Sequence, residues 1–133
     1  MSAKMALPMD ISMPILLLSV IVCILAITTH EAAHAWVSYR LGDDLAYKMG
    51  RVTLNPIPHI DLMMTIILPA VLLLSSAGFI FGGAKPVPVN MRAFRKPFLG
   101  MALVAIAGPL SNLIQAFLWA VVLKLFLQFG VWN

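Results

Sequence analysis

Charged residues and cysteine are both scarce in this sequence of 133 residues. Only 11% of the residues are charged and 62% are hydrophobic. So few charges exclude a disordered chain, and so much apolar surface exceeds what a soluble domain of this size can bury. The composition therefore predicts an integral membrane protein. The single cysteine, Cys23, excludes a disulfide within the chain, and we expect it to be a small core residue.

The few charged residues leave a net charge of +4. The basic residues flank apolar runs and do not form a basic face, so nucleic acid is excluded as a partner. A positive charge beside apolar runs suits the anionic headgroups of a lipid bilayer. We therefore expect the lipid bilayer to be one partner of this chain.

Three runs without a charged residue set the expected architecture, and they cover residues 11–29, 62–84 and 97–123. We predict a single all-α, membrane-embedded domain over residues 1–133. Its first helix is expected to begin at Pro14, where proline suits a first turn, and to end near Gly42. A cleaved signal peptide is the alternative for the first run, with Lys4 as its basic residue. No clear small-x-small cleavage site follows, so a retained span is favoured.

The second and third runs contain helix-breaking residues. Pro69 and several glycines interrupt the second run, which either crosses the bilayer or re-enters on the side from which it came. Gly108-Pro109 predicts a kink or break in the third run. Residues 51–54 alternate like a short strand, and the prolines of 85–90 suit an edge strand or polyproline stretch. The expected fold therefore has three apolar segments and two short strand-like segments.

Residues 30–34 read His30-Glu31-Ala32-Ala33-His34, directly after the first apolar run. Residues four apart lie on one face of a helix, so both histidines can bind one tetrahedral zinc. Glu31 lies about 100° round the helix, close enough to take a proton from a zinc-activated water. The competing interpretation is a polar patch for a neighbouring helix or a chance match, but ionisable groups beside hydrocarbon are costly unless they function.

Several motifs together resemble the site-2 protease family of intramembrane zinc metalloproteases, in the compact prokaryotic branch without a PDZ domain. They appear in the family's order and cover most of residues 15–120. The first is the His-Glu-Ala-Ala-His motif continued by Ala35 and Trp36. The others are Gly50-Arg51-Val52-Thr53-Leu54-Asn55-Pro56, His59-Ile60-Asp61, Ala84-Lys85-Pro86-Val87-Pro88-Val89-Asn90 and Ala107-Gly108-Pro109-Leu110-Ser111-Asn112.

The resemblance implies zinc as the cofactor, His30 and His34 as metal ligands, and Glu31 as the general base. It implies that Asn112 binds the substrate backbone or the oxyanion, while the alternative for Asn112 is an interhelical hydrogen bond. It also implies that the strand-like segments hold an extended substrate by edge pairing, which exposes a peptide bond that a helix would hide.

One part of the family's pattern is missing from this sequence. The family's third zinc ligand is an Asp in a Leu-Asp-Gly motif on a later helix, and no such motif occurs here. A catalytic zinc takes three protein ligands and a water. We expect the chain to be C-terminally incomplete. The alternatives are that a partner chain supplies the third ligand or that Asp61 does.

The sequence thus predicts a zinc metalloendopeptidase that cleaves membrane-protein substrates in or near their transmembrane segments. The alternatives are a catalytically incomplete member or fragment that binds membrane proteins, and a small metal carrier. The expected location is a prokaryotic cell membrane. If the second run re-enters, the positive-inside rule places the zinc site toward the cytoplasmic face.

Overall fold

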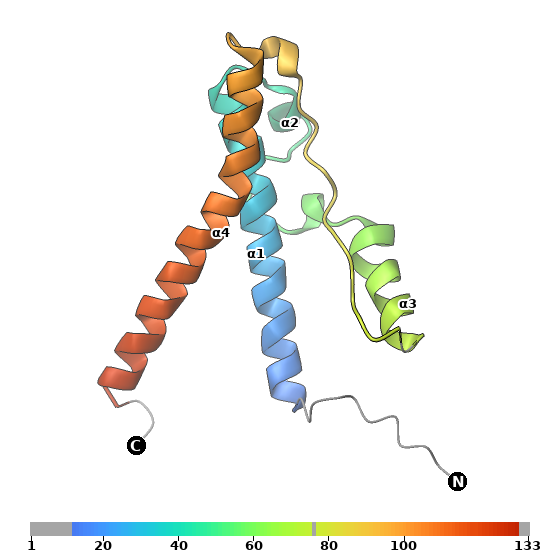
Figure 1. The fold of residues 1–133 in the computed structure, drawn as a ribbon, viewed down its shortest axis with the longest axis vertical. Coiled ribbons are helices and arrows are strands. Elements are labelled where there is room, and N and C mark those ends of the chain that lie inside the picture. The colour runs from blue at the N-terminus through green and yellow to red at the C-terminus, as the bar shows by residue number, and fades with distance from the viewer. Residues whose placement is uncertain (1–11, 76, 131–133) are drawn as a thin grey trace.

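The computed structural model of the protein describes residues 12–75 and 77–130 (Figure 1). The described residues are helical or irregular, and they include no β-strand. The elements in chain order are α1 (Met13–Arg40), α2 (Leu45–Lys48), the 3₁₀-helix η1 (Ile57–His59), the π-helix η2 (Leu62–Ile67), α3 (Leu68–Leu74), the 3₁₀-helix η3 (Met91–Ala93) and α4 (Pro97–Gln128). The predicted all-α fold is therefore confirmed, whereas the two segments predicted to be strand-like, residues 51–54 and 85–90, do not form strands. Lys4 lies outside the described residues.

Helix α1 begins and ends close to the predicted residues. Pro14 lies in its first turn, and the helix ends at Arg40 with Leu41 as its C-cap. Gly42 follows with a φ of 107°, a conformation that costs glycine little and other residues more. The glycine signal therefore marked the end of the helix correctly.

Helix α4 runs from Pro97 to Gln128 and includes Pro109. The break predicted at Gly108-Pro109 does not occur, because the helix continues through both residues. Figure 1 shows that α4 nevertheless changes direction along its length. Proline removes one backbone hydrogen bond from a helix, and bending of this kind is its usual consequence.

Within the described residues, α1 and α4 are the two helices long and apolar enough to cross a membrane. In their most apolar 18-residue windows, only 6% of the α1 window and none of the α4 window is buried. A core helix of a soluble protein would be mostly covered, so this exposure fits a membrane protein. Cys23 is also exposed, so its expected place in the core was wrong.

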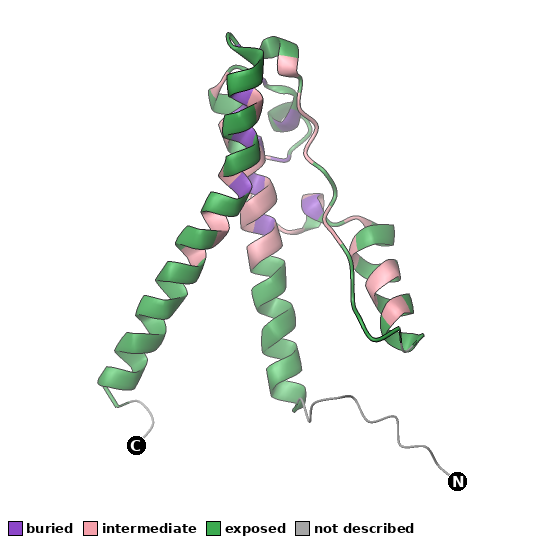
Figure 2. Cartoon of the chain, in the orientation of Figure 1, coloured by how far each residue is buried: buried purple, intermediate pink, exposed green. Residues whose placement is uncertain are grey.

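The two long helices contact each other along only part of their length. Figure 2 shows buried residues along the contact between α1 and α4 and in the neighbouring α2 and η1, whereas the other halves of the two long helices diverge with exposed surfaces. The contact is made by small or branched residues, including Ala32, Ala35, Val104 and Gly108. Small residues let helix backbones approach closely, and close packing stabilises helix pairs in membranes.

The second apolar run folds as a hairpin. Its first part forms η2 and α3, and Figure 1 shows the chain after α3 returning beside them. The Gly83 N–H donates to the Met64 carbonyl at 3.0 Å, and the Lys85 N–H donates to the His59 carbonyl at 2.9 Å. A Cβ at Gly82 would lie 2.6 Å from Pro69 Cγ, so the returning chain needs glycine there. The two ends of the run therefore lie side by side.

The buried carboxylate of Asp43 connects the end of α1 to residue 90, where the return segment of the hairpin ends. Asp43 is 1% exposed and accepts hydrogen bonds from the Ser38 hydroxyl at 2.9 Å and the Asn90 N–H at 2.7 Å. The Leu45 N–H also donates to it, at 3.1 Å. A buried carboxylate is costly unless its oxygens accept such bonds. Asp43 thus ties the turn between α1 and α2 to residue 90, which is 47 residues away in sequence.

Candidate metal centre

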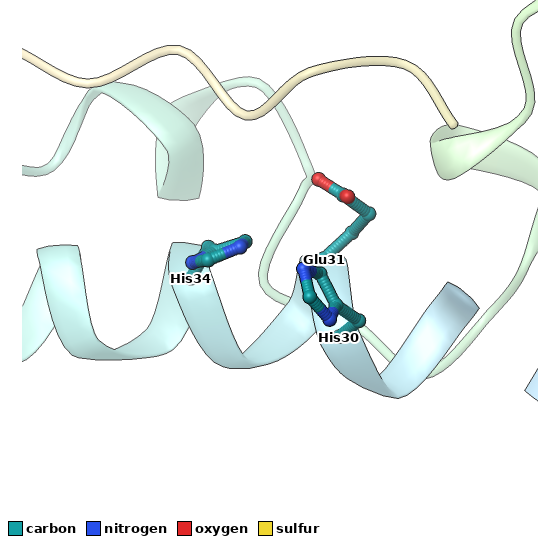
Figure 3. Close-up of side chains that lie close together, drawn as sticks. All are labelled: His30, Glu31 and His34. Atoms are coloured by element: carbon teal, nitrogen blue, oxygen red, sulfur yellow. The ribbon is translucent and has the colours of Figure 1, made fainter. Parts of the chain in front are cut away.

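The three side chains of the predicted metal site lie together on α1. Potential ligand atoms of His30, Glu31 and His34 all lie within 4.8 Å of one another. Figure 3 shows them projecting from neighbouring turns of the helix. The imidazole rings of the two histidines have centroids 4.7 Å apart and meet edge to face at 82°. All three residues are half-buried, so they are screened from bulk solvent without being sealed off.

The tautomer of His34 follows from its contact with α4. Its Nδ1 lies 2.5 Å from the Val104 carbonyl oxygen, which can only accept a hydrogen bond. Neutral His34 must therefore carry its proton on Nδ1, and the Nε2 lone pair is left available for a metal. A backbone carbonyl that orients a ligand histidine is a common second partner in metal sites.

His30 also has a partner on α4. The side-chain amide of Asn112 contacts it, with Nδ2 3.1 Å from His30 Nδ1, while the buried Asn112 Oδ1 has no hydrogen-bond partner. A half-turn of the amide would place Oδ1 against His30 Nδ1–H. That rotation would satisfy the buried oxygen and leave the Nε2 of His30 unprotonated. Asn112 therefore lies where it can orient a ligand, and its predicted substrate contact stays a prediction.

Gly108 lies against the two Nε2 atoms. A Cβ built on Gly108 would lie 2.5 Å from Nε2 of His30 and 2.4 Å from Nε2 of His34. The two nitrogens therefore converge on one small space that only a glycine leaves open. Two neutral imidazoles with convergent Nε2 atoms, beside a carboxylate, are a donor set that fits zinc.

Arg51 places a positive charge near this cluster from the loop after α2. It is 2% exposed and donates to the Lys85 and Pro86 carbonyls, at 2.5 and 3.1 Å. Burial lowers the pKa of Arg51, and the nearby Glu31 carboxylate opposes this shift. The guanidinium stays charged at neutral pH because an arginine pKa starts so high.

Asp61 is not part of the cluster that could hold a metal. It is the N-cap of η2, where its Oδ1 accepts from the Met64 N–H at 2.8 Å. The neighbouring His59 is 1% exposed, and its Nε2 lies 2.8 Å from the Thr53 carbonyl oxygen. Both residues therefore shape the loop and the hairpin, and Asp61 has the capping role that its position favoured.

A groove with a volume of about 440 Å³ lies between α1, the 52–54 loop and α4. None of His30, Glu31 and His34 lines it, so it is separate from the metal cluster. Its lining residues are Thr29, Ala32, Ala33, Trp36, Val52, Thr53, Leu54 and Ser111.

Sequence reasoning missed the two α4 features that define the site, namely the Val104 carbonyl and the space at Gly108. Gly108 belongs to the motif at residues 107–112, and this motif could have indicated that Gly108 lies at the metal site. No signal in the sequence marks a backbone carbonyl as a partner for a side chain far away in the chain.

Comparisons with known proteins found two bacterial relatives. Over 112 residues the chain is 51% identical to the putative zinc metalloprotease YwhC of Bacillus subtilis, covering 84% of this chain and 48% of YwhC. Over 96 residues it is 32% identical to the putative zinc metalloprotease Rip2 of Mycolicibacterium smegmatis, covering 71% of this chain and 35% of Rip2. The chain thus spans about half the length of the first relative and about a third of the second.

No protein-family model matches the sequence, and no solved structure matches it significantly. The two relatives agree with each other in name and together match most of this chain. This chain is therefore a homologue of bacterial proteins named as zinc metalloproteases, and that similarity supports the site-2 protease family to which its motifs point.

Proposed function

We propose that this chain is the zinc-binding core of a metalloendopeptidase that cleaves membrane proteins in or near their transmembrane segments. The observation that carries the proposal is the convergence of His30 Nε2 and His34 Nε2 beside the Glu31 carboxylate, on a helix long enough to cross a membrane. The names of the two relatives agree with it.

His30 and His34 would hold the zinc. When bound, zinc supplies Lewis acidity toward a water molecule and toward the carbonyl oxygen of a peptide bond. Glu31 takes the proton from the attacking water at a carboxylate oxygen and passes it to the leaving amine. Val104 and Asn112 fix the orientation of the two imidazoles, so that both Nε2 atoms stay aimed at the same place.

The substrate would bind as an extended segment of another membrane protein. The return segment 77–90 has no helical structure until η3, and Arg51 ties it to the loop that follows α2. These irregular segments lie near Glu31, and an unwound peptide could pair with their backbone. The third zinc ligand would come from a further segment or a partner chain, because Asp61 serves as a helix cap.

The test measures zinc content and peptide-bond cleavage together. The purified chain is reconstituted in lipid, supplied with zinc and a membrane-protein substrate, and compared with His34→Ala and Glu31→Gln. We expect His34→Ala to lose the zinc that the parent chain binds and Glu31→Gln to keep it. When the third ligand is supplied and the parent cleaves the substrate, Glu31→Gln should cleave at least about 100-fold more slowly, the scale of a lost general base. Asp44→Asn, which changes an exposed carboxylate, is the control. Unchanged zinc in His34→Ala would contradict the ligand assignment.

A further inference from the structure

Five exposed basic side chains lie at the end of the molecule where α1 finishes and α4 begins. They come from the end of α1, from α2, from η3 and from the residues just before α4. We call this set the basic end, and it consists of Arg40, Lys48, Arg92, Arg95 and Lys96.

Buried contacts bring these segments together. The Asp43 carboxylate, just after α1, accepts from the Asn90 N–H at 2.7 Å, directly before η3. A Cβ at Gly42 would lie 3.3 Å from the Ala93 carbonyl oxygen, so the two turns touch. Phe94 is 5% exposed and packs against Gly100 in the first turns of α4. The five cations are therefore held on one rigid surface, as Figure 1 shows for the segments that carry them.

The positive charge of the basic end is largely uncompensated. In the part of the chain that the structure describes, Lys48 has an ion-pair partner, Asp44 at 2.7 Å, and the other four cations have none. Asp43 is the other carboxylate nearby, but it is 1% exposed and already accepts hydrogen bonds from Ser38 and Asn90. The surface thus presents five cations and one exposed carboxylate.

Aromatic residues mark the depth of this surface in a bilayer. Trp36 and Tyr39 lie in the last turns of α1 and are 54% and 41% exposed. Arg40 lies over the Trp36 ring at 5.8 Å, and Tyr39 stacks on Tyr47 with ring centroids 4.6 Å apart. Exposed tryptophan and tyrosine between apolar helix and basic residues are typical of the membrane–water interface. The basic end therefore lies at the level of lipid headgroups.

We propose that the basic end binds the headgroups of anionic phospholipids in the leaflet that it borders. Lipid is favoured over an acidic peptide because the apolar helix α1 ends at this surface and the apolar helix α4 begins there. A bilayer around the two helices would place lipid phosphates beside the basic end. Each Lys or Arg near such a surface strengthens binding about fivefold, so several together give a marked preference over zwitterionic lipid. The proposal is independent of any protease activity.

The test is a lipid titration of the detergent-solubilised chain by native mass spectrometry, with phosphatidylglycerol, phosphatidylcholine and an oligoglutamate peptide as probes. We expect phosphatidylglycerol to bind at least about tenfold more tightly than phosphatidylcholine. The triple variant Arg92→Gln, Arg95→Gln, Lys96→Gln should lose this preference. Lys124→Gln, which removes an exposed cation from the far part of α4, should keep it.

Three results would overturn the proposal. The first is equal affinity for the two lipids, the second is an equal preference in the triple variant and Lys124→Gln, and the third is binding of the peptide in place of the lipid. A second measurement on the parent chain needs no variant that might misfold. Between about 0.05 M and about 0.5 M salt, screening should weaken phosphatidylglycerol binding several-fold. Affinity that is insensitive to salt would also refute the electrostatic proposal.

Discussion

At the scale of single residues, Gly108 decides whether the two histidines can share a metal. Three imidazole atoms, His34 Nε2, His30 Nε2 and His34 Cε1, lie within 2.6 Å of the place where a Cβ would stand. A methyl group there would push both rings away and occupy the space that borders both Nε2 atoms. Glycine is therefore required by the site, beyond any need for close helix packing.

We predict that Gly108→Ala abolishes the zinc binding that the parent chain shows and lowers the stability of the chain by about 1–3 kcal/mol, the usual cost of overpacking. Gly100→Ala is the matched control, because a Cβ there would lie 2.4 Å from Phe94 and its three nearest atoms all belong to Phe94, not to a histidine. Gly100→Ala should lose comparable stability and keep zinc. Metal analysis and thermal unfolding of both variants in detergent distinguish the two effects. Full zinc occupancy in Gly108→Ala would show that the histidines bind metal elsewhere.

The sequence predicts some of these single-residue features and not others. The spacing of His30 and His34 places both imidazoles on one face of a helix wherever that helix goes, so their proximity could be predicted. Which nitrogen stays free depends on Val104 and Asn112, which belong to a helix at the other end of the chain. Helical periodicity carries no information about such distant partners, so the tautomers needed the structure.

At the scale of elements, Arg51 holds the return segment of the hairpin against the loop after α2. Its guanidinium donates to the carbonyls of Lys85 and Pro86, while its own Nε is buried without a partner. Hydrogen bonds from a charged donor contribute more than neutral ones, and two of them act on consecutive residues here. Together with the contacts of Gly83, Lys85 and Asn90, this side chain holds the segment in place.

We expect Arg51→Met to free the segment around residues 85–90. Amide hydrogen exchange in these residues should become faster, and the chain should lose about 2 kcal/mol of stability, because the carbonyls of Lys85 and Pro86 lose a charged donor. Arg40→Met, which changes an exposed arginine, should leave exchange in the segment unchanged. If protection of residues 85–90 is the same in Arg51→Met as in the parent, the segment is held by its other contacts.

The elements show where local sequence suffices and where it does not. Pro14 and Gly42 are local signals, and α1 begins and ends beside them. Gly108-Pro109 is also a local signal, yet α4 continues through it, because a proline in a long apolar helix can bend the helix without ending it. The return of residues 77–90 depends on contacts such as that between Gly83 and Met64, which no periodicity encodes.

At the scale of the whole molecule, two long helices and one short hairpin share a single buried region. The helices α1 and α4 cross near the metal cluster and diverge away from it (Figure 2). The hairpin begins at η2 and returns to the same side, since Lys85 bonds to His59 and Asn90 bonds to Asp43. Exposed basic residues gather at this end, whereas Lys124 lies in the other part of α4.

This arrangement predicts that residues 48 and 90 face the same side of the membrane, the cytoplasmic side by the positive-inside rule. In a Cys23→Ser background, Lys48→Cys and Asn90→Cys should react with an impermeant maleimide from the cytoplasmic face. Gln128→Cys, at the end of α4, should react from the opposite face. This labelling pattern is the one expected when α1 and α4 each cross the membrane once and the hairpin does not cross it. Labelling of residues 48 and 90 from opposite faces would show that the middle run spans the bilayer, and the zinc site would then need a different orientation.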